Sequence, residues 1–209
     1  MCGPLAMSAR LAARLLELDE GALPELSRQY VELIARSSQE SSELVADLLN
    51  FARLGHQALT IHRVDPGEIV AAVQATFNES NPGVRWTLNT MPTCDADEGL
   101  LRLVFINLLS NAYKFTAYQS DPFVEAGAIE VDGGHAYYVR DNGVGFDATQ
   151  YARMFNVFER LHRPEDFPGT GAGLAIVRRI VERHGGKVWA ESEVGNGATF
   201  FFKLPPIAG

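Results

Sequence analysis

Two stretches near the N-terminus carry apolar residues at the three- and four-residue spacing of an amphipathic helix. They cover residues 5–18 and 26–51, and a Gly-Ala-Leu-Pro break at residues 21–24 separates them. Two antiparallel helices cannot enclose their own apolar faces, so burial against a second copy is the economical arrangement. We therefore expect residues 1–58 to form a helical hairpin that makes a four-helix bundle in a homodimer. A hairpin that folds back on the following residues and leaves a monomer is the open alternative.

The rest of the chain, residues 59–209, alternates between helical and strand-like runs, which predicts a second domain. Helical spacing extends from Pro66 to about Asn78, from Asp97 to Phe115 and over residues 174–181. Strand-like runs cover residues 60–64, 84–90, 129–132, 135–140, 187–192 and 198–204. The whole pattern predicts an α+β fold, in which the N-terminal helical hairpin is followed by an α/β sandwich whose mixed sheet is covered by helices on one face.

Composition and charge narrow the range of partners. The chain has 209 residues and is 46% hydrophobic, which is ample for a packed core. Its formal charge of −8 argues against general attraction to nucleic acid or anionic lipid. No run approaches the ~18 apolar residues of a membrane span, and Cys2 and Cys94 lack metal-ligand spacing. We therefore expect a cytoplasmic protein with no nucleic-acid partner and no membrane segment in this chain.

Two glycine-rich loops carry the candidate chemistry. The first, Asp-Asn-Gly-Val-Gly at residues 141–145, follows a strand-like run, so Asp141 is expected at a strand end, where it can accept a hydrogen bond from an exocyclic amine. The second, Gly-Thr-Gly-Ala-Gly at residues 169–173, leads into a helix, so its backbone N–H groups would face an anion. Taken singly, each loop is also explained by the glycines that tight turns require.

The order of the segments changes this interpretation. An aromatic and basic run at residues 154–163 lies between the loops, and a helical run at residues 103–116 precedes them. Together the four segments resemble the N box, first glycine box, phenylalanine box and second glycine box of the sensor histidine kinase ATP-binding domain. The wider fold family includes gyrase, Hsp90 and MutL. The residues that link the boxes look like those of the kinases attached to bacterial phytochromes.

The resemblance implies that ATP and Mg²⁺ are cofactors. Asn111 would ligate the magnesium that bridges the phosphates, and Asn107 would hold a water or a further part of the metal shell. Lys114 would face phosphate. Without the glycine loops, these residues would simply be solvated positions on an amphipathic helix. The full set that the resemblance assigns to nucleotide binding is Asn107, Asn111, Lys114, Asp141, Gly143, Gly145, Phe155, Phe158, Arg160, Gly169, Thr170, Gly171, Gly173 and Leu174.

A lid over the nucleotide is expected at residues 160–170. Phe155 and Phe158 would anchor its start while packing as ordinary core residues. Of the basic residues in this segment, Arg160 is the first candidate for reaching phosphate when the lid closes. The Gly-Asn-Gly run at residues 195–197 resembles the last glycine box, but we expect it to act mainly as a turn between strands.

The phosphoacceptor expected of the family is missing. Histidine kinases transfer phosphate to a histidine on the first hairpin helix, and only the tail of that motif stands here, at residues 2–5. Two interpretations stay open. One is a histidine kinase core that signals to a response regulator receiver domain, with an acceptor lost by truncation and with a separate sensor protein as a further partner. The other is a degenerate kinase, scaffold or phosphotransfer module that docks a partner through the hairpin. A gyrase- or Hsp90-type ATPase is disfavoured, because Asn107 stands where a water-activating glutamate is expected.

Overall fold

A computed structural model describes residues 3–17, 23–54, 58–78, 81–157, 159, 161, 167 and 169–205. The chain divides after Gly55 into two compact units. Among the described residues, every helix is too short or too polar to cross a bilayer.

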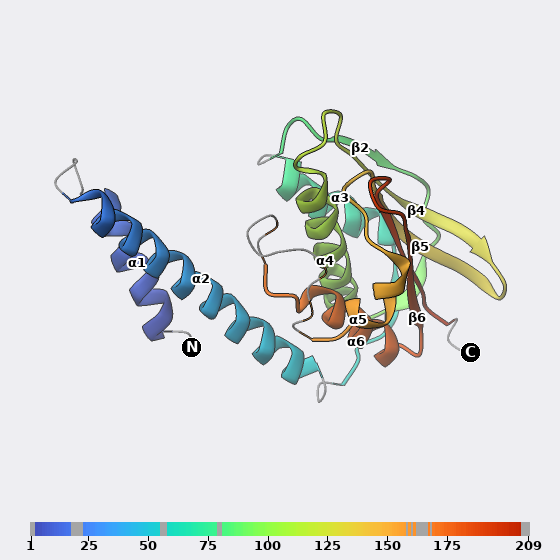
Figure 1. Ribbon diagram of the computed structural model, residues 1–209. Coiled ribbons are helices and arrows are strands. Elements are labelled where there is room, and N and C mark those ends of the chain that lie inside the picture. The colour runs from blue at the N-terminus through green and yellow to red at the C-terminus, as the bar shows by residue number, and fades with distance from the viewer. Residues whose placement is uncertain are drawn as a thin grey trace. The chain divides into compact units, whose positions relative to one another are not determined.

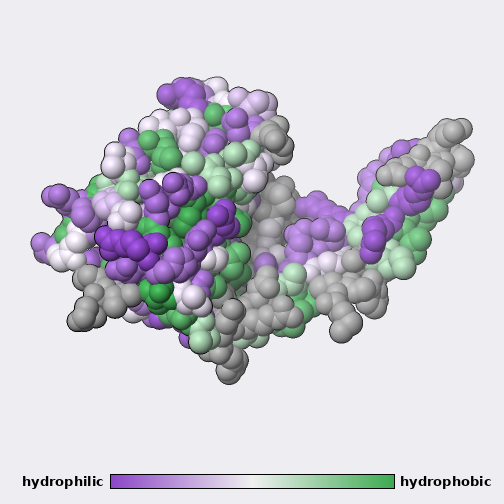
Figure 2. Space-filling model, turned by 180° about the vertical axis from the view of Figure 1, so that it is seen from behind, coloured by the Kyte–Doolittle hydropathy of each residue, from purple (hydrophilic) through white to green (hydrophobic). Residues whose placement is uncertain are grey.

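The first unit is a hairpin of two helices, α1 (Gly3–Glu17) and α2 (Glu25–Leu54), which pack against each other. Many of its large apolar side chains remain exposed. Leu26 is 62% exposed and Leu33 is 61% exposed, and Figure 2 shows part of this apolar surface along the hairpin. The two helices therefore do not enclose their own apolar faces.

The second unit contains a five-stranded mixed sheet. Its strand order is β2-β4-β5-β7-β6, with β2 parallel to β4 and every other neighbouring pair antiparallel. The strands are β2 (Arg85–Leu88), β4 (Phe123–Val131), β5 (Gly134–Asp141), β6 (Lys187–Ser192) and β7 (Ala198–Lys203). A separate antiparallel pair joins β1 (His62–Val64) to β3 (Cys94–Ala96).

Three helices cover one face of this sheet and leave the other face open (Figure 1). They are α3 (Pro66–Asn78), α4 (Glu98–Thr116) and α6 (Gly173–Arg183). Two short elements, η1 (Ala148–Gln150) and α5 (Tyr151–Met154), precede α6. The central helix α4 is buried along most of its length, and the ring of its Phe105 lies edge-on against Phe202 of β7 at 5.5 Å. The predicted α+β fold, with a hairpin followed by a mixed sheet covered on one face, is confirmed.

Two differences from the predicted strands have local causes. Strand β4 begins at Phe123, before the predicted start at residue 129. The earlier part was not predicted because Gly127, at the centre of the strand, carries no strand signal. A Cβ at Gly127 would lie 2.8 Å from the Tyr138 hydroxyl, so the glycine makes room for that ring. Strand β3 was not predicted, since three residues are too few to show alternation.

Candidate functional site

Asp141 is the last residue of β5, and its side chain is 4% exposed. Its Oδ1 accepts a hydrogen bond from the backbone N–H of Gly143 at 2.8 Å, and the backbone N–H of Ala198 also donates to the carboxylate. Burial raises the pKa of Asp141 to about 6, and these two N–H groups partly oppose the rise. At neutral pH the protein therefore holds a buried, mainly ionised carboxylate at the strand end.

The first glycine loop packs against the C-terminal end of α4. The backbone N–H of Val144 donates to the carbonyl oxygen of Phe115 at 3.3 Å. A Cβ at Gly143 would lie 2.5 Å from the same oxygen, so a larger residue could not approach the helix this closely. The loop that carries Asp141 is thus attached directly to the helix that carries Asn111.

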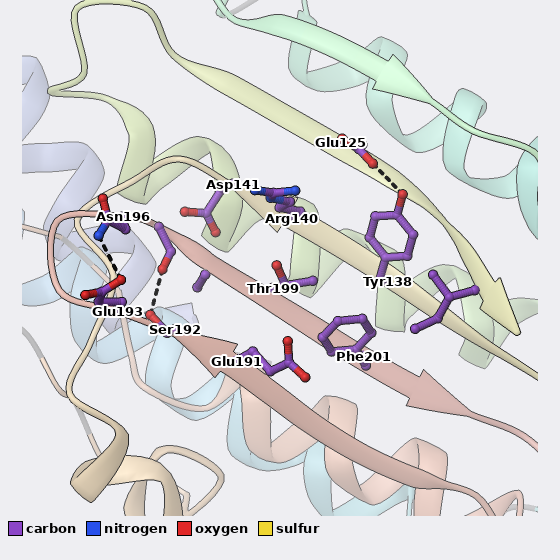
Figure 3. Close-up of a pocket in the computed structure, with 13 residues that line it drawn as sticks. Glu125, Tyr138, Arg140, Asp141, Glu191, Ser192, Glu193, Asn196, Thr199 and Phe201 are labelled. Carbon is purple, nitrogen blue, oxygen red and sulfur yellow. Dashed lines mark hydrogen bonds between the residues drawn. The ribbon is translucent and has the colours of Figure 1, made fainter. Parts of the chain in front are cut away.

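The turn at residues 195–197 also packs against the first glycine loop. Gly197 has φ +81°, and a Cβ there would collide with the carbonyl oxygen of Asp141. Ser192 Oγ donates to the carbonyl of Gly197 at 2.7 Å and accepts from the N–H of Phe146 at 2.9 Å, and Figure 3 shows the first of these bonds. Besides turning the chain, this segment supports the backbone around Asp141.

The second glycine loop runs alongside α4. Where α6 begins, a Cβ at Gly173 would lie 2.7 Å from Oδ1 of Asn107. The Asn107 amide also donates to the carbonyl of Leu103 at 2.8 Å. At the other end of the loop, a Cβ at Gly169 would lie 3.5 Å from Nζ of Lys114. The loop therefore extends along α4 from Lys114 to Asn107.

Asn111 lies between these two contacts on the same face of α4, because residues three and four apart on a helix are neighbours. It is half-buried, and within the described part of the chain its amide has no hydrogen-bond partner. Lys114 Nζ lies 4.3 Å from the centre of the Phe115 ring. Both glycine loops thus reach α4, which presents an available amide and a lysine.

The remaining predicted residues are placed as follows. Phe155 is buried and meets the Tyr151 ring edge-on at 5.6 Å. Thr170 Oγ1 accepts from the N–H of Ala172 at 3.3 Å, while Gly171 and Leu174 are half-buried. Phe158, Arg160 and most of the expected lid lie outside the described residues.

This arrangement of loops around α4 has counterparts among known proteins. Residues 96–208 match the family described as histidine kinase-, DNA gyrase B-, and HSP90-like ATPase. The chain belongs to this family. Proteins of this ATPase family bind ATP, and the resemblance to sensor histidine kinases is confirmed by the relatives and solved structures that follow.

Cyanobacterial phytochrome B of Nostoc sp. is 36% identical to this family member over 83% of this chain and 24% of the relative. The circadian input-output histidine kinase CikA of Synechococcus elongatus is 31% identical over 97% of this chain and 28% of the relative. Full-length ShkA, solved in complex with AMPPNP, is 34% identical, with a TM-score of 0.69 over 97% of this chain and 43% of that one. The chain therefore spans about a quarter of the length of the two curated relatives.

A hollow of about 510 Å³ lies on the open face of the sheet, and Asp141 is among the residues that line it (Figure 3). Three glutamates line it, Glu125, Glu191 and Glu193, together with one arginine, Arg140. An anionic triphosphate would be repelled by this excess of carboxylates. Because side chains alternate along a strand, Arg140 is exposed on the open face, whereas Asp141 belongs to the buried row of β5 with Tyr137 and Val139. The side of the sheet that α4 covers, where both glycine loops contact this helix, is therefore the candidate site for an anionic ligand.

Asn142 is a residue of the first glycine loop that sequence reasoning did not single out. Its Oδ1 accepts from the N–H of Phe123 at 2.8 Å, and its Nδ2 donates to the carbonyl of Asp121 at 2.9 Å. These bonds attach the loop to the start of β4. No local sequence pattern predicts these two hydrogen bonds, because the partners of Asn142 lie about twenty residues away in the chain.

Proposed function

We propose that residues 59–209 form a catalytic domain that binds Mg-ATP, and that the chain is the core of a sensor histidine kinase. Its family membership supports a kinase role. The observation that carries the proposal is that both glycine loops contact α4. The first loop, which begins with Asp141, contacts the C-terminal end of α4. The second loop contacts Asn107 and Lys114, on either side of Asn111.

Different groups of the chain would bind different parts of the nucleotide. The Asp141 carboxylate would accept a hydrogen bond from the exocyclic amine of adenine. Backbone N–H groups of the second glycine loop and the N-terminus of α6 would hold the phosphates. Lys114 would neutralise part of their charge. In phosphoryl transfer the protein mostly positions the reactants and stabilises charge, and this set of residues is suited to that task.

Magnesium fits the residues present. Among the described residues, no group of three histidine, cysteine or acidic side chains could form an all-protein metal cage. Mg²⁺ is commonly held by one or two protein oxygens together with phosphates and waters. The available amide oxygen of Asn111 suits that role, and Asn107 would hold a water or a further part of the shell. Bound magnesium would neutralise charge on the phosphates.

Replacing Asn111 by alanine is expected to remove the magnesium dependence of ATP binding. We expect Mg²⁺ to tighten ATP binding about tenfold in the unchanged protein and to have no effect in Asn111→Ala, as expected for the loss of a contact to a charged group. Calorimetric titration with and without Mg²⁺ measures this. The control is Ser110→Ala, because Ser110 is the exposed neighbour on the same helix. A magnesium effect that survives in Asn111→Ala would contradict the assignment.

The γ-phosphoryl group would pass to a histidine that lies outside α1, because α1 contains none. The proposed onward partner is a response regulator receiver domain. The second candidate is a degenerate kinase or scaffold that docks a partner through the hairpin. It is supported by the same observation, that α1 contains no histidine.

Incubation with ATP labelled at the γ-phosphate separates the two candidates. We expect no stable label on the chain itself and acid-labile label on a version extended upstream to restore a histidine on the first helix. A histidine-to-glutamine change in the extension is the control. Absence of label from the extended chain, under conditions where it binds ATP, would overturn the kinase and leave the scaffold.

The exposed apolar surface of the hairpin supports a homodimer with a four-helix bundle. Side chains such as Leu11, Leu15, Leu26 and Leu33 are each more than half exposed in one copy. Pairing two hairpins would remove this area from water. Light scattering on the purified chain measures the mass, and a monomer at micromolar concentration would contradict the dimer.

A further inference from the structure

The ring of His184 forms hydrogen bonds to backbone groups of two different helices. Its Nε2 lies 3.1 Å from the backbone N of Asp97, at the start of α4, and its Nδ1 lies 2.8 Å from the carbonyl oxygen of Ile180, in α6. A backbone N–H can only donate and a carbonyl oxygen can only accept. Nε2 is therefore unprotonated and Nδ1 carries the proton, so the two contacts select one neutral tautomer.

Asp97 is itself held firmly. It is the N-cap of α4, and its Oδ1 accepts from the N–H of Leu100 at 3.1 Å. Its Oδ2 accepts from the N–H of Thr60 at 3.0 Å. Burial alone would raise the pKa of Asp97, but these backbone N–H donors outweigh it, so the pKa is lowered overall. His184 therefore contacts the N-cap of α4, whose carboxylate makes two further hydrogen bonds.

A second contact joins the same two helices further along. Oδ1 of Asn107 lies 2.7 Å from the position that a Cβ of Gly173, the first residue of α6, would take. At 1.5 Å per residue, Asp97 and Asn107 are about 15 Å apart along α4, and Gly173 and His184 about 16 Å apart along α6. Two stretches of nearly equal length that meet at both ends must lie side by side and antiparallel. The contacts together determine the axial register of α4 against α6.

We propose that His184 is a positioning residue for the nucleotide site: its Nε2 sets the axial register of α4 against α6, so that Asn111 and Lys114 face the second glycine loop. This inference rests on the proposed function, because the loop and α4 are taken to hold the two sides of one nucleotide. A slide of a single residue moves α4 by about 1.5 Å relative to the loop. Displacements of that size at a reacting centre lower rates strongly.

The simpler alternative is that His184 only caps the C-terminal end of α6. Two substitutions distinguish the roles, because asparagine places its amide near the position of Nδ1 and glutamine places its amide near that of Nε2. His184→Asn keeps the bond to Ile180 and loses the bond to Asp97. His184→Gln keeps an acceptor for the N–H of Asp97 and loses the side-chain bond to the carbonyl of Ile180.

The test is calorimetric titration of the full chain and both variants with Mg-ADP, together with thermal unfolding of each. We expect His184→Gln to bind within about twofold of the unchanged protein and His184→Asn to bind about five- to tenfold more weakly, the effect of one lost hydrogen bond. This order must appear even where the two variants unfold at similar temperatures. Equal affinities, or weaker binding by His184→Gln, would overturn the proposal in favour of the cap.

Hydrogen exchange of the Asp97 amide provides a readout that does not depend on nucleotide. It should be faster in His184→Asn than in His184→Gln, and equal rates would overturn the register role. If the unchanged protein fails to bind Mg-ADP, the proposed function fails, and the exchange rates alone decide whether the contact between the helices exists.

Discussion

Asp141→Asn is expected to lose about 100-fold in affinity for adenine nucleotides while making the fold more stable. The loss follows from replacing a charged acceptor opposite an amine by a neutral amide, since a hydrogen bond to a charged group contributes about 1.5–3 kcal/mol. The gain in stability is expected because the substitution removes a buried charge. Asp141 is 4% exposed and its pKa is raised to about 6, so the ionised carboxylate destabilises the fold at neutral pH.

The sign of the pH dependence follows from the same pKa. Native Asp141 binds a proton more tightly than the unfolded chain does, so its contribution to stability is present below the unfolded pKa of 3.8 and is lost as the pH rises through about 6. Above that pH, Asp141→Asn should raise the free energy of unfolding by about 1–2 kcal/mol. Nucleotide affinity should have the opposite pH dependence to this stability contribution. It should weaken as the pH falls below about 6, where Asp141 becomes protonated.

Urea unfolding and calorimetric titration across this pH range measure both effects. Asp147→Asn is a suitable control, because Asp147 is an exposed carboxylate close to the same loop. Unchanged nucleotide affinity in Asp141→Asn would remove the adenine assignment. A stability that does not respond would instead show that the buried carboxylate is compensated by its two backbone donors.

Gly197→Ala is expected to be far more damaging than Gly195→Ala, although the two glycines have nearly equal φ angles of +81° and +83°. An alanine at either position carries the cost of a left-handed conformation, about 1 kcal/mol. At Gly195 nothing lies within 4 Å of the added Cβ, so this cost should be the whole effect. At Gly197 the Cβ collides with the carbonyl oxygen of Asp141, which should bring the total to about 3 kcal/mol or more.

The collision has a functional consequence as well. Relief requires the backbone at Asp141 to move, so Gly197→Ala should weaken nucleotide binding whereas Gly195→Ala should not. Chemical unfolding and Mg-ADP titration of the two variants test this directly. Equal destabilisation by the two alanines would contradict the close contact between Gly197 and the carbonyl oxygen of Asp141.

Helices and strands with a long local pattern were predictable from the sequence. Pro66 and Asp97 mark the starts of α3 and α4, and the alternation over Lys187–Ser192 coincides with β6. Prediction failed where the local signal is short or is replaced by a packing requirement. Strand β3 has three residues, and Gly127 in β4 is present because Tyr138 lies over it.

The sequence by itself determined the kinds of element, their order and the chemical groups available to a nucleotide: a carboxylate after a strand, two amides and a lysine on a helix, and two glycine loops. Those properties are encoded by periodicity and by motif order. Only the tertiary structure decided which groups meet. The closeness of Gly173 to Asn107, of Gly197 to Asp141 and of His184 to Asp97 joins residues distant in the chain, and such contacts arise from packing that no local pattern records.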